Sequence, residues 1–145
     1  MSVYEQFNTF MVDIWGRINK IEERALAAGL EADISITEIH IIEKIGDLPC
    51  RRMSDVARAI GITLATLTVA CDKLETKGLI ARSRDQKDKR VVNVSLTPRG
   101  MAAYEFHKRF HAEMMQAVLG DLTEEEAGVL GSSLQKLQNF FESYE

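Results

Sequence analysis

The sequence has little cysteine and no long apolar stretch, and both features exclude some classes of protein. Only two of its 145 residues are cysteines, Cys50 and Cys71, and their spacing matches neither a metal-binding pair nor a disulfide framework. We therefore expect a protein of a reducing compartment, the cytosol. The apolar runs are far too short to span a membrane, and residues 1–6 lack the pattern of a secretory signal. Apolar residues still make up 46% of the chain, which is enough for a folded core.

The groupings on which catalytic sites depend are also missing. The chain contains no recognisable pair of nucleophile and base, and no glycine-rich loop of the kind that cradles phosphate. It has no internal repeats and no low-complexity tracts. Its length is that of one domain. Because the catalytic groupings are missing, we expect this domain to bind a partner and not to act as an enzyme.

The charges of the chain are unevenly distributed. The net charge is −4, yet residues 51–99 carry 11 Lys/Arg and 5 Asp/Glu, a local net charge of +6, and the remaining residues carry −10. A basic segment between acidic ends is typical of a chain that presents one face to phosphate. Such segregation also occurs without a polyanionic partner, so charge alone leaves both interpretations open.

Apolar periodicity and capping signals predict a mainly helical chain whose elements follow the order ααααββαα. Residues at three- and four-residue steps give the first helix one long apolar stripe. Ser35 with Glu38, and Thr123 with Glu126, match the capping box that begins a helix. Outside the basic segment, the expected helices span residues 3–28, ended by Gly29, then 35–45, 98–119 and the residues after Thr123.

The basic segment carries the pattern of two short helices followed by a hairpin. A helix over 53–60 is joined by a tight turn at 61–62 to a helix over 63–77. Two strands follow over 79–84 and 91–96, with a charged connection between them. This order predicts a winged helix-turn-helix, a mainly α fold with a small β-wing.

The second helix of this pair is expected to bury one face and expose the other. Its apolar stripe comprises Leu67, Ala70, Cys71 and Leu74. The opposite face offers hydroxyls, methyls and one ammonium group, which suit phosphates and base edges in a major groove. The wing adds several cations for phosphate contacts. Both sets also fit an ordinary solvated surface. The candidate DNA contacts are Thr63, Ala65, Thr66, Thr68, Val69, Lys73, Arg82, Arg84, Lys87, Asp88, Lys89 and Arg90.

Five motifs, in this order and spacing, resemble the MarR family of bacterial transcriptional regulators. They are Met53–Ala57, Ile60–Thr63, Leu74–Ile80, Asp88–Arg90 and Leu96–Gly100. The resemblance extends over nearly the whole chain. It implies a protein that binds duplex DNA as a homodimer. It also implies that the protein has no enzymatic activity and does not bind a membrane.

The resemblance also implies how the chain is organised. In that family the first and last helices intertwine into a dimer, and each subunit presents one winged domain. A single domain is therefore expected over 1–145, with dimerisation helices in 1–34 and 98–145 and the DNA-binding part over 35–97. By the family pattern, Arg90 enters the minor groove and Asp88 holds it in position.

Within the family, the chain is most similar to the FabT-type repressors of fatty-acid synthesis. The residues that carry this similarity are Asp33–His40, Thr63–Thr68, Arg90–Val92 and His107–Met114. That group responds to acyl chains on acyl carrier protein, and flexible apolar side chains suit an acyl tunnel. The same side chains equally fit a dimer core. The candidate effector pocket comprises Phe10, Met11, Ile14, Trp15, His40, Phe106, His107, Phe110, His111 and Met114.

Two further interpretations stay open. His107 and His111 share one helical face and, with His40 and Glu22, resemble the ligand set of zinc-sensing members of the family. Alternatively these histidines pair with carboxylates or phosphate, and no cofactor is present. A protein of another class, a dimeric interaction module whose basic wing binds an acidic protein, fits the same charge pattern.

Overall fold

The computed structural model of the chain describes residues 1–30 and 33–144. Residues 31–32 and 145, which belong to the predicted dimerisation segments, lie outside the described residues. The chain divides into two compact units, residues 1–107 and residues 108–145. Helix α6 (Pro98–Gly120) begins in the first unit and ends in the second.

The N-terminal helical segment is longer than predicted and is not uniformly α-helical. It consists of α1 (Val3–Thr9), a π-helical turn over Phe10–Ile14 and α2 (Trp15–Leu30). The expected stop at Gly29 is wrong, because the helix continues through it. Glycine is used there for close packing, since a methyl group added at Gly29 would overlap the ring of Phe106.

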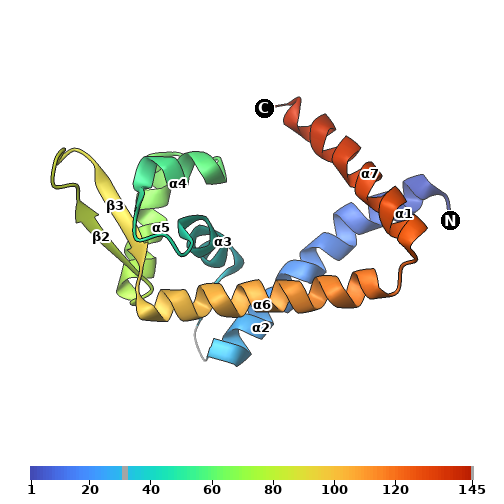
Figure 1. The fold of residues 1–145 in the computed structure, drawn as a ribbon, viewed down its shortest axis with the longest axis horizontal. Helices are drawn as coiled ribbons and strands as arrows, with labels where there is room; N and C mark the ends of the chain where they lie inside the picture. The colour runs from blue at the N-terminus through green and yellow to red at the C-terminus, as the bar shows by residue number, and fades with distance from the viewer. Residues whose placement is uncertain (31–32, 145) are drawn as a thin grey trace. The chain divides into compact units, whose positions relative to one another are not determined.

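Three helices form the centre of the first unit, beside the hairpin (Figure 1). They are α3 (Ile36–Ile45), α4 (Met53–Ile60) and α5 (Leu64–Thr76). The predicted capping box begins α3, because the Ser35 hydroxyl accepts the Glu38 N–H and the Glu38 carboxylate accepts the Ser35 N–H. Gly61 ends α4 with φ of 83°, a left-handed conformation that glycine adopts without strain.

The wing belongs to a three-stranded antiparallel sheet of order β1-β3-β2. The two predicted strands are present as β2 (Ile80–Arg84) and β3 (Val92–Leu96). The sequence missed β1 (Arg51–Arg52), which pairs with β3 through Arg51 opposite Val94. Two residues are too few to show a strand periodicity, so β1 exists only through this tertiary pairing.

A single apolar core holds α5 and the sheet together. Fully or almost fully buried side chains come from α2, the helices α3 to α5, the sheet and the start of α6. Full burial of one Val, Leu, Ile or Met side chain stabilises a fold by about 1.5–3 kcal/mol. The core members include Leu26, Ile39, Ile42, Ile45, Val56, Leu67, Cys71, Leu74, Ile80, Val94 and Ala103.

The second unit contains the end of α6 and helix α7 (Glu124–Glu142), which the predicted capping box of Thr123 and Glu126 begins. None of the described residues in 108–144 is buried. The side chains of Leu134, Phe140 and Phe141 are each more than half exposed. Among the described residues, no single helix is long and apolar enough to cross a membrane; α4 and α5 meet that test only as a pair bent by 107°.

Candidate nucleic-acid interface

Helix α5 presents the predicted face to solvent. Leu67, Cys71 and Leu74 are completely buried, and Ala70 is half-buried, so the helix is fixed to the core by the expected stripe. The six candidate contacts on the opposite face are all exposed: Thr63, Ala65, Thr66, Thr68, Val69 and Lys73. Their exposure follows from the period of the helix, and their contact with DNA stays a prediction.

Two hydroxyls on this face are held by the helix itself. Thr63 caps α5, because its Oγ1 accepts the Thr66 N–H at 3.1 Å and donates to Thr66 Oγ1 at 2.9 Å. Thr68 donates its hydroxyl proton to the Leu64 carbonyl at 2.8 Å. The Thr66 hydroxyl therefore keeps its own proton for an outside acceptor, whereas Thr68 offers mainly its methyl group.

Asp85 shapes the tip of the wing. The Asp85 carboxylate accepts the backbone N–H groups of Lys87 and Asp88, both at 3.0 Å, and the Asn93 amide at 3.1 Å. These hydrogen bonds lower the pKa of Asp85 below its ordinary value. The tip is therefore a defined turn, fixed by one ionised side chain.

Asp88 holds Arg90 as the family resemblance implies. The Asp88 carboxylate accepts from Arg90 Nε at 3.1 Å, from Nη2 at 3.2 Å and from the backbone N–H at 3.1 Å. The hydrogen bonds from Arg90 lower the pKa of Asp88. The Arg90 side chain is nevertheless 90% exposed. A paired yet exposed guanidinium is pre-oriented for a groove.

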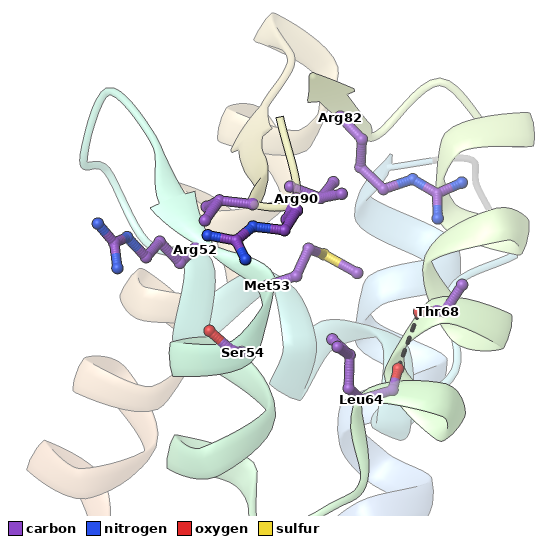
Figure 2. Close-up of a pocket in the computed structure, with 9 residues that line it drawn as sticks. Arg52, Met53, Ser54, Leu64, Thr68, Arg82 and Arg90 are labelled. Carbon is purple, nitrogen blue, oxygen red and sulfur yellow. Dashed lines mark hydrogen bonds between the residues drawn. The ribbon is translucent and has the colours of Figure 1, made fainter. Parts of the chain in front are cut away.

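The remaining wing cations divide into two groups. Arg84, Lys87 and Lys89 are exposed, and Arg84 donates to the Lys89 carbonyl at 2.9 Å. Arg82 differs, because its side chain is only 18% exposed and is bound to carboxylates of α5. Figure 2 shows Arg82 reaching from the wing toward α5, on the far side of Arg90 from Arg52.

A cavity of about 220 Å³ is lined by residues of the wing, β1, α4 and α5 (Figure 2). Arg90 and Arg52 bring positive charge to it, while Met53 and Leu64 give it an apolar side. Its full lining consists of Arg52, Met53, Ser54, Leu64, Thr68, Arg82, Arg90, Val91 and Val92.

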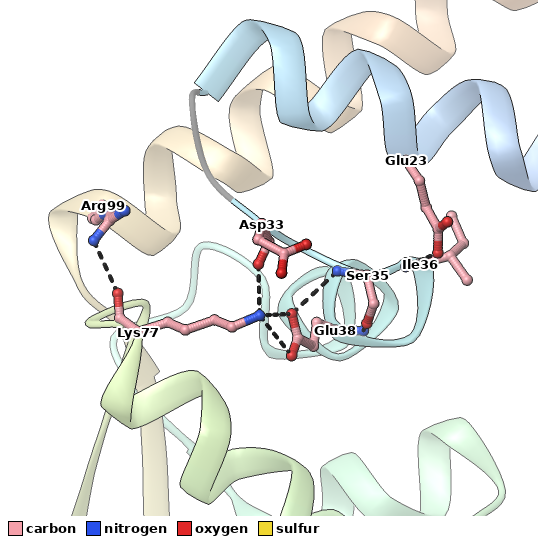
Figure 3. Close-up of polar contacts among 7 residues, drawn as sticks. All are labelled: Glu23, Asp33, Ser35, Ile36, Glu38, Lys77 and Arg99. Carbon is pink, nitrogen blue, oxygen red and sulfur yellow. Dashed lines mark hydrogen bonds and ion pairs between the residues drawn. The ribbon is translucent and has the colours of Figure 1, made fainter.

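The end of α5 is tied to α3 by an ion pair that sequence reasoning missed. Lys77 Nζ lies 2.8 Å from Glu38 Oε2 and 3.0 Å from Oε1, and it also donates to the Asp33 carbonyl (Figure 3). Arg99 of α6 donates to the Lys77 carbonyl at 3.0 Å. The sequence identifies Glu38 only as a capping residue, because its 39-residue separation from Lys77 leaves no local signal.

Some of the predicted effector and metal-binding residues are buried in the first unit. Glu22 and His107 are buried, with 3.7 Å between Glu22 Oε2 and His107 Nε2. His107 Nδ1 lies 3.6 Å from Glu43 Oε1, and the ring centroids of His40 and His107 are 6.4 Å apart. Carboxylate and imidazole are both ligand types that zinc accepts in proteins.

The other predicted effector residues are spread along the chain. Phe106 packs against the core, Ile14 is partly buried, and Phe10, Met11 and Trp15 are between 42% and 56% exposed. Phe110, His111 and Met114 belong to the second unit. His111 lies four residues after His107 on α6. The acyl pocket and the four-ligand metal site stay predictions.

The two cysteines differ in their burial. Cys71 is completely buried, and this burial raises the pKa of its thiol to about 11. Its sulfur lies 4.0 Å from the sulfur of Met53. Cys71 is therefore a core residue, as its place on the buried stripe predicts, and Cys50 is exposed and free.

Comparisons with known proteins agree with this architecture. The MarR family model matches residues 34–92. The multiple antibiotic resistance protein MarR of Salmonella typhimurium is 31% identical over 122 residues, which cover 83% of this chain and 85% of that protein. The HTH-type transcriptional repressor MdtR of Bacillus subtilis is 28% identical over 107 residues, covering 74% and 69%.

A solved structure is similar over almost the full length. Streptococcus pneumoniae FabT in complex with DNA shares 37% identity and a TM-score of 0.91, covering 98% of this chain and 99% of that one. This likeness confirms the predicted winged helix-turn-helix fold, and the relatives' names confirm a regulator in place of an enzyme. The chain belongs to the MarR family of DNA-binding transcriptional regulators.

Proposed function

We propose that this protein is a homodimeric repressor of fatty-acid synthesis genes and that acyl chains on acyl carrier protein change its affinity for DNA. The observation that carries this proposal is the likeness to S. pneumoniae FabT in complex with DNA, at 37% identity over nearly the whole chain. The exposed face of α5 and the Asp88–Arg90 pair supply groups for base edges and phosphates.

Dimer formation accounts for the exposed apolar side chains of the first and last helices. Trp15 is 56% exposed in the first unit, and Phe140 and Phe141 are 54% and 52% exposed in the second. Large apolar side chains in this number are costly in water, so a second copy of the chain is expected to cover them. Two α5 helices of a dimer would then enter successive major grooves, about 10 bp apart, on a near-palindromic site. Protection of a single half-site by one subunit would contradict this arrangement.

The proposed effector binds mainly through apolar contacts. Each additional buried methylene of an acyl chain contributes about 0.8 kcal/mol until the tunnel is full. The change in operator affinity equals the difference in effector affinity between two conformations of the dimer. A response that grows with chain length is therefore the expected signature.

The experiment is a titration of operator affinity with acyl carrier protein loaded with chains of increasing length. Unloaded acyl carrier protein is the control for purely ionic contact between the acidic carrier and the basic wing. A scrambled duplex of equal length is the control for base reading, because only base contacts give sequence preference. An effect of the unloaded carrier as large as that of the longest chain would refute the acyl proposal.

A zinc effector is the competing proposal, and the buried pairing of Glu22 with His107 is the observation that favours it. In that case chelation abolishes operator binding, and His107→Ala has the same effect as chelation. Metal-dependent operator affinity that ignores acyl chain length would replace the acyl proposal with this one.

A further inference from the structure

We propose that Arg82 is a positioning residue that fixes the wing against α5, and that it is not a phosphate ligand. The inference deepens the DNA-binding function and rests on it. It separates Arg82 from the other cations of the wing, all of which the sequence placed together at the DNA.

Arg82 forms a bridge between the sheet and α5. Its Nη2 lies 2.6 Å from Asp72 Oδ1, and its Nε lies 3.1 Å from Glu75 Oε2. Its backbone is opposite the buried Val94 in the β2–β3 pairing, so the base of the side chain is anchored in the sheet. Asp72 follows Thr68 by one helical turn, and the bridge therefore ends beside the DNA-facing surface of α5.

The charges at this bridge disfavour a phosphate. One guanidinium lies between two carboxylates, so the group of three carries a net charge of −1. The hydrogen bond from Arg82 holds the pKa of Glu75 below its ordinary value, so Glu75 stays ionised at neutral pH. Two of the three guanidinium nitrogens, Nε and Nη2, already donate to carboxylates, and a phosphate at Arg82 would lie beside both of these negative charges.

Arg84 provides the matched comparison within the same strand. It lies two residues further along β2, on the same face, and is exposed. It donates to the backbone carbonyl of Lys89, and a contact with a neutral group leaves its positive charge unneutralised. Arg84 therefore has the environment of a phosphate ligand, and Arg82 does not.

A mutant cycle tests the assignment through operator affinity. Arg82→Gln is compared in the parent and in the Asp72→Asn/Glu75→Gln background. If Arg82 acts through the two carboxylates, the single change weakens binding about tenfold, the double change also weakens it, and the triple variant is no weaker than Arg82→Gln. If Arg82 is a phosphate ligand, removing the carboxylates strengthens binding, and Arg82→Gln costs at least as much in that background.

The salt dependence of binding gives a second readout. Arg82→Gln is expected to leave the slope of log affinity against log salt unchanged. Arg84→Gln is expected to reduce the magnitude of the slope by about 1.8, because each of the two subunits loses one phosphate contact and each contact contributes about 0.9. A reduced slope for Arg82→Gln would overturn the inference. Melting temperatures of both variants serve as the folding control.

A third readout is independent of DNA. In the free protein, Arg82→Gln and Asp72→Asn/Glu75→Gln should accelerate amide hydrogen exchange in β2 and β3 to the same extent, and Arg84→Gln should not. Unchanged exchange in β2 and β3 overturns the positioning role even if operator binding is lost. If the exchange result is as expected but the parent protein binds no duplex, the proposed function is wrong and the bridge between Arg82 and α5 still holds.

Discussion

Gly100→Ala tests how closely α6 must approach the wing. Gly100 lies in the first turn of α6 and is buried, and its N–H donates to Thr97 Oγ1 at 3.1 Å. A methyl group added there would overlap the carbonyl oxygen of Leu79 and would lie 2.9 Å from its carbonyl carbon. Leu79 joins α5 to β2 and is 1% exposed, so its backbone has no room to withdraw.

The expected magnitude is the difference between two opposing effects. Overlap with backbone atoms, which cannot rotate away as a side chain can, belongs to the upper part of the range for overpacking, about 2–3 kcal/mol, and Ala is a better helix former than Gly by about 1 kcal/mol. A net destabilisation of about 1–2 kcal/mol lowers the melting temperature by about 3–8 °C in a domain of this size.

Gly29→Ala is the matched control, because the group that its methyl would overlap is the ring of Phe106, a side chain that can rotate. Helix propensity then offsets most of the cost, and the melting temperature should change by less than in Gly100→Ala. Thermal unfolding followed by circular dichroism, at one protein concentration, measures both. Gly100→Ala with the parent's stability, or a larger loss in Gly29→Ala, would refute the close approach of α6 to Leu79.

Three further predictions concern the interface and the cysteines. Arg90→Ala should weaken operator binding about tenfold, most on AT-rich sites with a narrow minor groove, and should change stability by less than about 0.5 kcal/mol; equal affinity of variant and parent would remove Arg90 from the groove. Thr66→Ala should relax base preference more than it lowers total affinity, which duplex selection experiments measure, and an unchanged preference would contradict base reading by its hydroxyl. At pH 8, iodoacetamide should label Cys50 and spare Cys71, because a thiol with a pKa of about 11 is ionised to only about 0.1% at that pH; rapid labelling of Cys71 would contradict its burial.

The parts of the fold that local signals specify were predictable from the sequence. The caps at Ser35, Thr63 and Thr123 need only residues three positions apart, and each is present. The buried stripe and the exposed face of α5 follow from helical period once the cap fixes the start.

The errors occur where a distant segment decides the local structure. A glycine at position 29 is typical of the end of a helix, but here the helix continues through Gly29, which packs closely against Phe106. Strand β1 depends on pairing with β3, more than 40 residues away. The Asp72 and Glu75 partners of Arg82 lie on another element, so a count of basic residues could not distinguish Arg82 from Arg84.

The same difference between local and distant signals applies to the predicted site residues. Asp88 and Arg90 are two positions apart, so the motif itself brings them together, and the structure pairs them at 3.1 Å. The effector residues come from segments far apart in the chain, and neither periodicity nor composition determines whether they share one pocket.

The central claim is sequence-specific binding of duplex DNA by two copies of this chain. An equilibrium titration of the DNA upstream of fatty-acid synthesis genes, against a scrambled duplex at one physiological salt concentration, tests it with stoichiometry measured in the same samples. The expected result is two chains per duplex and a preference of at least about 10³-fold for the operator. Equal affinity for both duplexes, or binding of one chain per site, would contradict it.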